Sequence, residues 1–143
     1  MPIRQIEIRG QRCLTMPSFL NPLLKQPGVP FRLVNARNQQ VVAAQLMTAF
    51  DSATRRTGLL QHRAMPESAA LIIAPCSAVH TIGMHFAIDV AFVSREGRVL
   101  SLRHAVKPWR MAAALRAFAV IELAAGTLAI ADTRPGDSLV IVG

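Results

Sequence analysis

Residues 85–105, HFAIDVAFVSREGRVLSLRHA, carry the clearest fold signal in the chain. Two apolar segments flank the sequence REGR at 95–98, and a glycine inside such a turn is typical of a β-hairpin. Successive side chains of a strand point to opposite faces, so Ile88, Val90 and Phe92 are expected to share one face. Asp89 then lies on the other face, between two alanines. The stretch predicts an antiparallel strand pair with an acid inside one strand.

The sequence on both sides of this hairpin predicts further short elements. Strands are expected within FRLVNA (31–36), QQVVAAQLMTAF (39–50), ALIIAP (70–75), FAVIELAAG (118–126) and RPGDSLVIVG (134–143), with a hairpin connection at 35–39. Short helices are expected over 52–63, capped by Asp51 or Ser52, and over WRMAAALRAF at 109–118, which is rich in strong helix formers. We therefore expect an α+β fold, in which a mainly antiparallel or mixed sheet curls into a partly closed barrel with two or three short helices.

Length and composition favour a single compact domain built around one apolar core. The chain has 143 residues, of which 52% are hydrophobic and 17% charged, and these values exclude general disorder. Prolines punctuate residues 1–30 and exclude a long helix there. We interpret residues 1–30 as an N-terminal surface arm and residues 31–143 as the single β-rich domain.

The chain is strongly basic, with a formal net charge of +8. Its basic residues are scattered, which permits weak, non-specific binding of nucleic acid but does not require it. No apolar stretch approaches the roughly 20 residues of a spanning helix, and the N-terminus lacks the apolar region of a signal peptide. We expect a cytoplasmic protein without membrane association, in which Cys13 and Cys76 are buried thiols rather than a disulfide.

Two acids stand inside predicted strands, where a carboxylate needs a partner. Asp89 and Glu122 could meet across adjacent strands as paired carboxylates for acid–base chemistry. The alternative is a structural role, with Asp89 bound by an arginine or a backbone donor and Glu122 held by one of the arginines at 55, 56 and 63. The structural alternative is favoured.

A second polar cluster is PCSAVHTIGMH at residues 75–85. Cys76 and His80 could form an activated thiolate–imidazole pair near Asp89, but the usual cysteine spacing of a zinc site is missing. A buried core thiol is the favoured interpretation of Cys76. Further along, the only tryptophan, Trp109, stands between Lys107 and Arg110, where it could stack on a base or sugar ring or close the mouth of the barrel.

Short motifs between Arg55 and Val142 resemble those of the family known as domain of unknown function 192. The matching pieces are Arg55-x-x-Gly58-Leu59-Leu60, Met84-x-x-x-x-Asp89-x-x-Phe92, Glu96-Gly97-Arg98-Val99, Pro108, Ile121-Glu122-Leu123-Ala124-Ala125-Gly126 and Gly136-Asp137. Residues 76–81 resemble a Cys-x-x-Val-His-Thr subgroup of that family. The resemblance implies a small β-rich domain and brings no known reaction.

These observations leave three functional hypotheses. The first is a binding module with a small polar pocket for an unknown small molecule or protein, lined by Asp89, His80, Glu122, Arg55 and Cys76. The second is a hydrolase or isomerase that uses His80 with Cys76 or Asp89, and the third is non-specific nucleic-acid binding through the basic surface. No metal site and no cofactor are expected, and the protein is expected to be a monomer or homodimer.

Overall fold

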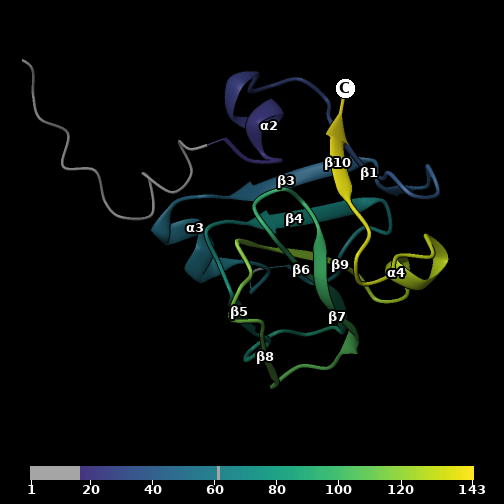
Figure 1. Cartoon of the computed structure of the whole chain (residues 1–143). Coiled ribbons are helices and arrows are strands. Elements are labelled where there is room, and N and C mark those ends of the chain that lie inside the picture. Colours follow the sequence, from purple (N-terminus) through teal and green to yellow (C-terminus); the bar gives the residue numbers. More distant parts are fainter. Residues whose placement is uncertain (1–16, 61) are drawn as a thin grey trace, which may run out of the picture.

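The computed structural model describes residues 17–60 and 62–143 (Figure 1). The elements follow in the order α2 (Asn21–Lys25), β1 (Arg32–Asn35), β2 (Val41–Ala43), β3 (Gln45–Ala49), α3 (Ser52–Thr57), β4 (Ala69–Ile73), β5 (Ala78–His80), β6 (Ile88–Val93), β7 (Val99–Val106), β8 (Met111–Ala113), β9 (Ala119–Ala124), α4 (Thr127–Ile130) and β10 (Leu139–Val142).

The described strands divide among three sheets. The central sheet has the order β3-β4-β9-β6-β7, a second sheet has the order β10-β1-β2, and β5 pairs with β8 alone. In the central sheet β3 and β4 run parallel and the other pairs run antiparallel, so α3 and the loop after it form the crossover of a single β-α-β unit. The expectation of an α+β fold with mostly β structure and two or three short helices is confirmed for the described residues, which contain three.

The predicted barrel is replaced by separate layers. The segment 39–50, expected as one β-rich stretch, breaks at Ala44 into β2 and β3, which belong to different sheets. Because the chain leaves one sheet and enters another there, the described strands do not close on each other. Figure 1 shows the strand pair β5 and β8 at the end of the molecule remote from α2 and β10.

The central sheet is covered on both faces. Every residue of β4 and β6 is buried, and so is all of β9 except its last position. One face packs on the β10-β1-β2 sheet, through residues such as Leu33 and Ile141. The other packs on Leu59 and on the β5–β8 ribbon. The single core predicted from the sequence is thus divided into two clusters, one on each face of the central sheet. Consecutive residues of a central strand pack alternately into one cluster and the other.

Most predicted elements form, and one does not. The hairpin at 85–105 becomes β6 and β7, and Asp51 caps α3 by accepting a hydrogen bond from the Thr54 N–H at 2.8 Å. The helix predicted over 109–118 is wrong. Met111–Ala113 forms β8, where Ala112 pairs with Val79 of β5 and packs on the central sheet. Strand pairing with β5 there outweighs the helical propensity of the alanines.

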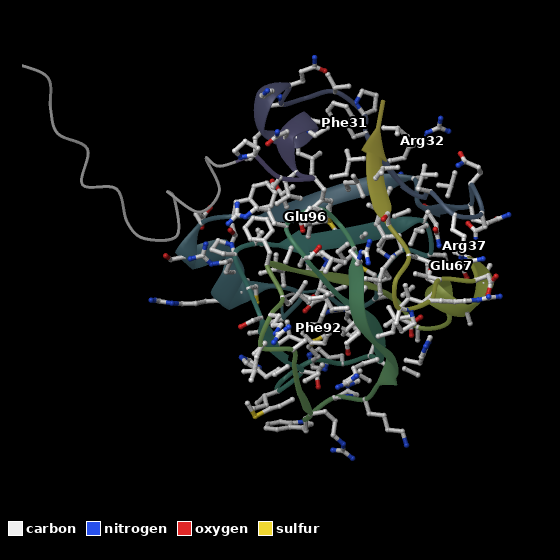
Figure 2. All side chains as sticks on the ribbon, viewed as in Figure 1. Phe31, Arg32, Arg37, Glu67, Phe92 and Glu96 are labelled. Carbon is white, nitrogen blue, oxygen red and sulfur yellow. The ribbon has the colours of Figure 1, made fainter. Side chains whose placement is uncertain are left out.

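The segment leading into β10 is fixed by one buried carboxylate. Asp137 accepts hydrogen bonds from Arg37 Nε and from Asn35 Nδ2, both at 2.7 Å. These partners hold the pKa of Asp137 at about 2, below its ordinary value of 3.8. The last strand is thereby tied to the β1–β2 turn, and Figure 2 shows Arg37 on the side of the molecule that carries α4.

Gly97, in the β6–β7 turn, is required both by its positive φ and by a close backbone contact. Gly136 shares only the positive φ, so a comparison of the two glycines separates the two effects. Gly97 has φ +86°, and a Cβ built there would lie 2.4 Å from the Leu139 carbonyl oxygen. Gly136 has φ +91° and no atom within 4 Å of such a Cβ. Both alanine variants should suffer the same backbone strain, so we expect Gly97→Ala to lower the free energy of unfolding by about 1–3 kcal/mol more than Gly136→Ala. Urea denaturation of the two variants measures this difference, and equal losses would contradict it.

Candidate functional site

A cavity of about 80 Å³ lies where the end of α3 meets β5 and the central sheet. Its lining includes four of the five predicted site residues, namely Arg55, Cys76, His80 and Glu122. The buried side chains of Leu59, Ile73 and Met84 supply apolar wall. Segments 55–60, 73–80 and 122 are thus brought together from three separate parts of the chain.

Glu122 is the buried acid of this cavity. It is only 4% exposed, because β9 is a central strand and Glu122 points to the face that also carries Val90 and Phe92. Its Oε2 atom is buried and has no hydrogen-bond partner, and no ion pair of Glu122 occurs among the described residues. Burial raises the pKa of Glu122 from 4.5 to about 7. The carboxyl group at the cavity wall therefore lacks a hydrogen-bond donor from the protein.

Asp89 does not belong to this site. It pairs in register with Leu123, whereas Glu122 pairs with Val90, so the two acids point to opposite faces of the sheet and do not meet. The Asp89 carboxylate accepts hydrogen bonds from the backbone N–H groups of Ala105 at 2.8 Å and of Gly126 and Leu128 at 3.0 Å. Asp89 thus joins β7 and the start of α4 to β6, and its partners are backbone donors.

Arg55 faces the backbone rather than Glu122. Its Nη1 donates to the Phe50 carbonyl oxygen at 2.8 Å and approaches the Ala74 carbonyl oxygen at 3.5 Å. These contacts hold α3 against the ends of β3 and β4. Arg55 thus lines the cavity, but its hydrogen bonds serve the fold. Arg56, the next residue, is exposed and also lines the cavity.

Cys76 and His80 share the cavity but are not an activated pair. The Cys76 thiol donates to the Ala78 carbonyl oxygen, with sulfur and oxygen 3.0 Å apart, and burial raises its pKa above the ordinary value. The His80 side chain is exposed and makes no hydrogen bond with the residues that the structure describes. A thiolate nucleophile is therefore disfavoured here. Cys13 lies outside the described residues, so the disulfide expectation is not tested.

The part of the chain that the structure describes holds no cluster of three or more histidine, cysteine or acidic side chains that could bind a metal ion. It also contains no helix long and apolar enough to cross a membrane.

The tryptophan segment forms a second, separate feature. Thr81 is buried, accepts the Arg110 N–H at 2.8 Å and donates its hydroxyl to the Lys107 carbonyl oxygen at 2.7 Å. This holds the loop between β7 and β8 so that Trp109 is 66% exposed and Met111 is 78% exposed. Trp109 therefore faces solvent and does not close a barrel mouth.

The apolar part of the cavity, chiefly Leu59 and Met84, was not predicted from the sequence. Both had been visible as members of short family motifs, Arg55-x-x-Gly58-Leu59-Leu60 and the methionine before β6. Helical and strand periodicity could not find them, because both lie outside regular elements. Their common feature is a position in a loop that folds back over the central sheet.

Comparison with known proteins gives a family and a fold. The model of the family DUF192, described as "Uncharacterized ACR", matches residues 33–141. The structure is similar to that of a protein of unknown function from Novosphingobium aromaticivorans DSM 12444, with TM-score 0.64 and 20% identity over 80% of this chain and 89% of that one. It is also similar to a "putative transcription regulator" from Sinorhizobium meliloti 1021, with TM-score 0.62 and 21% identity over 76% of this chain and 89% of that one. The comparison with curated proteins found no match.

The unpaired carboxyl group of Glu122 predicts a distinctive pH dependence of stability. Its folded pKa of about 7 exceeds its ordinary value of 4.5, so the folded state binds the proton more tightly than the unfolded state. The contribution of Glu122 to stability is therefore most favourable below pH 4.5 and is lost as the pH rises to about 7. At roughly 1.4 kcal/mol per pH unit the loss is about 3 kcal/mol.

We expect Glu122→Gln to remove this loss. The free energy of unfolding of the variant, relative to that of the wild type, should therefore rise by up to about 3 kcal/mol between pH 4 and pH 8. Urea denaturation of both proteins over this range measures the gain, and their difference cancels the other titrating groups. A difference that stays constant with pH would contradict the prediction.

Proposed function

The chain belongs to the DUF192 family, and since that family brings no known reaction, we propose from the site itself that this domain is a binding module. It takes a small polar ligand, or the polar end of a larger one, in the cavity beside α3. The observation that carries the proposal is Glu122, 4% exposed, with a buried oxygen that no protein group satisfies. An unpaired buried polar group costs free energy in the folded protein, and a ligand that supplies the missing hydrogen bond recovers it.

The rest of the lining supports a ligand site. The lining combines an apolar wall with polar groups of different chemistry, among them Glu122, His80 and Arg56, and small-molecule sites likewise combine apolar walls with placed polar groups. The cavity of about 80 Å³ is roughly half the volume of an engineered apolar cavity of about 150 Å³ that holds benzene. A group of a few heavy atoms fits inside it.

Catalysis is the less favoured function for the same cavity. The pKa of Glu122, about 7, suits a general acid or base. However, the Cys76 thiol is held protonated by burial, and His80 has no hydrogen bond to an acid or thiol among the described residues. Binding needs only the unsatisfied acceptor, whereas catalysis needs a second positioned group.

The binding proposal is tested by blocking the mouth of the cavity. Ala78 is exposed, lies on β5 and lines the cavity, so Ala78→Phe should fill its entrance without touching the carboxyl group of Glu122. Ala129→Phe, at an exposed position on α4, is the matched control. A fragment screen followed by NMR is expected to shift the amide signals of residues such as Leu59, Ala78 and Glu122. These shifts should be lost in Ala78→Phe and kept in Ala129→Phe. Fragments that bind elsewhere, or that ignore the Ala78 variant, would contradict the proposal.

A second function, contact with single-stranded nucleic acid, is favoured by the exposed tryptophan. Trp109 is 66% exposed beside the exposed cations Lys107 and Arg110. Between Gly97 and Ala131 the only acid in the sequence is Glu122, which is buried, so this segment adds no exposed acid to offset the two cations. An exposed aromatic ring among cations can stack on a base while the cations neutralise phosphates.

This second function is tested with a labelled single-stranded oligonucleotide at several salt concentrations. Trp109→Ala should weaken binding about fivefold or more, because stacking on an aromatic ring is worth roughly 1–3 kcal/mol per base. Lys107→Gln with Arg110→Gln should reduce the slope of log K against log salt by about 1.4. The control, Lys25→Gln with Arg32→Gln, removes the same charge at the end of the molecule where Figure 2 shows Arg32. Equal effects of the two double variants would indicate a diffuse charge effect and reject the local site.

A further inference from the structure

The chemistry of the cavity narrows the ligand class, an inference that rests on the proposed binding function. The exposed fractions of the lining residues distinguish the inner part of the cavity from its rim. Glu122 is 4% exposed and Met84 and Leu59 are 5% and 2% exposed, whereas Arg56 and His80 are exposed and stand at the rim. A ligand that enters therefore meets an apolar wall and one carboxyl group at its inner end.

No described group at the inner end competes for that carboxyl group. The Cys76 thiol, the other inner polar group, already donates to the Ala78 carbonyl oxygen. Arg55, which also lines the cavity, donates to the Phe50 carbonyl oxygen and forms no ion pair with Glu122. Burial alone shifts the titration of Glu122, with no contribution from a neighbouring charge. The protein thus provides a hydrogen-bond acceptor, the Glu122 carboxylate, and no donor for it among the described residues.

We infer that the cavity binds a ligand that presents a cationic nitrogen donor, of the ammonium or amidinium class, to the carboxylate of Glu122. An ionised carboxylate only accepts hydrogen bonds, so its complement is a donor, and a positive donor also offsets its buried charge. The outer part of such a ligand lies near Arg56 and His80, which would favour an acceptor or an anionic group there. The cavity of about 80 Å³ limits the inner group to roughly four heavy atoms.

Three probes of nearly the same size and planar shape separate the classes. Acetamidinium is cationic and donates, acetone is neutral and only accepts, and acetate is anionic and only accepts. Each is titrated at millimolar concentration into the full chain, and binding is followed by NMR on the amides around the cavity and on the 13C-labelled carboxyl group of Glu122. The carboxyl signal reports the pKa of Glu122 in the wild type, so the result does not depend on a variant that folds.

We expect acetamidinium to bind in preference to acetone and acetate and to lower the pKa of Glu122. Because the free carboxyl group titrates at about 7, only its ionised fraction is competent, and binding should be about tenfold weaker at pH 6 than at pH 8. Glu122→Gln should abolish this pH dependence and most of the binding, while the Arg32→Gln control should keep both.

The failures of the ligand class and of the binding module are distinguishable. Tighter binding of acetate or acetone, or acetamidinium binding that is independent of pH, overturns the ligand class and leaves the pocket standing. The ligand class is also rejected, and the pocket retained, if none of the three probes binds while other fragments bind in the cavity and are blocked by Ala78→Phe. If no compound of any class binds there, both the class and the binding function are rejected.

Discussion

The three inner strands of the central sheet are buried on both faces, and the rest of the structure depends on that constraint. The strands β4, β6 and β9 offer almost no side chain to water, so nearly every position on them must be apolar or fully hydrogen-bonded. The second sheet and α4 cover one face, and Leu59 and Leu60 after α3 cover the other together with the β5–β8 ribbon. Figure 1 shows α3 and α4 on opposite sides of the molecule. Each polar residue in these strands therefore needs a reason to be there.

Asp89 and Glu122 show the two ways in which a central strand can hold an acid. They lie on neighbouring strands, one register position apart, yet on opposite faces. Asp89 receives three backbone hydrogen bonds and in return joins β7 and α4 to the sheet. Glu122 receives none at Oε2 and destabilises the folded protein when ionised. The contrast separates a structural acid from a candidate functional one better than burial alone, since both are buried.

The sequence predicted the strands well because their signal is local. Alternation in residues 85–105 placed Asp89 and Phe92 on opposite faces, and this face assignment agrees with the two core clusters. Pairing between distant segments is not local, which explains both failures. The helix predicted from the alanines after Trp109 became β8, because β5 offered an edge to pair with. The barrel gave way to layers because one residue, Ala44, redirects the chain between sheets.

The candidate site was predictable as a set of residues but not as an arrangement. Four of the five predicted residues line one cavity, because residue type alone marks an acid, a thiol and a histidine as unusual in an apolar chain. What the sequence could not give is which acid is satisfied, since the donors for Asp89 are backbone groups that any residue supplies. The expectation that an arginine at 55, 56 or 63 holds Glu122 was wrong for the same reason: Arg55 lies at the cavity, yet its bonds go to backbone carbonyls. A glutamate in a central strand without a partner adds no stability at neutral pH, and for this reason we propose that the cavity receives a ligand.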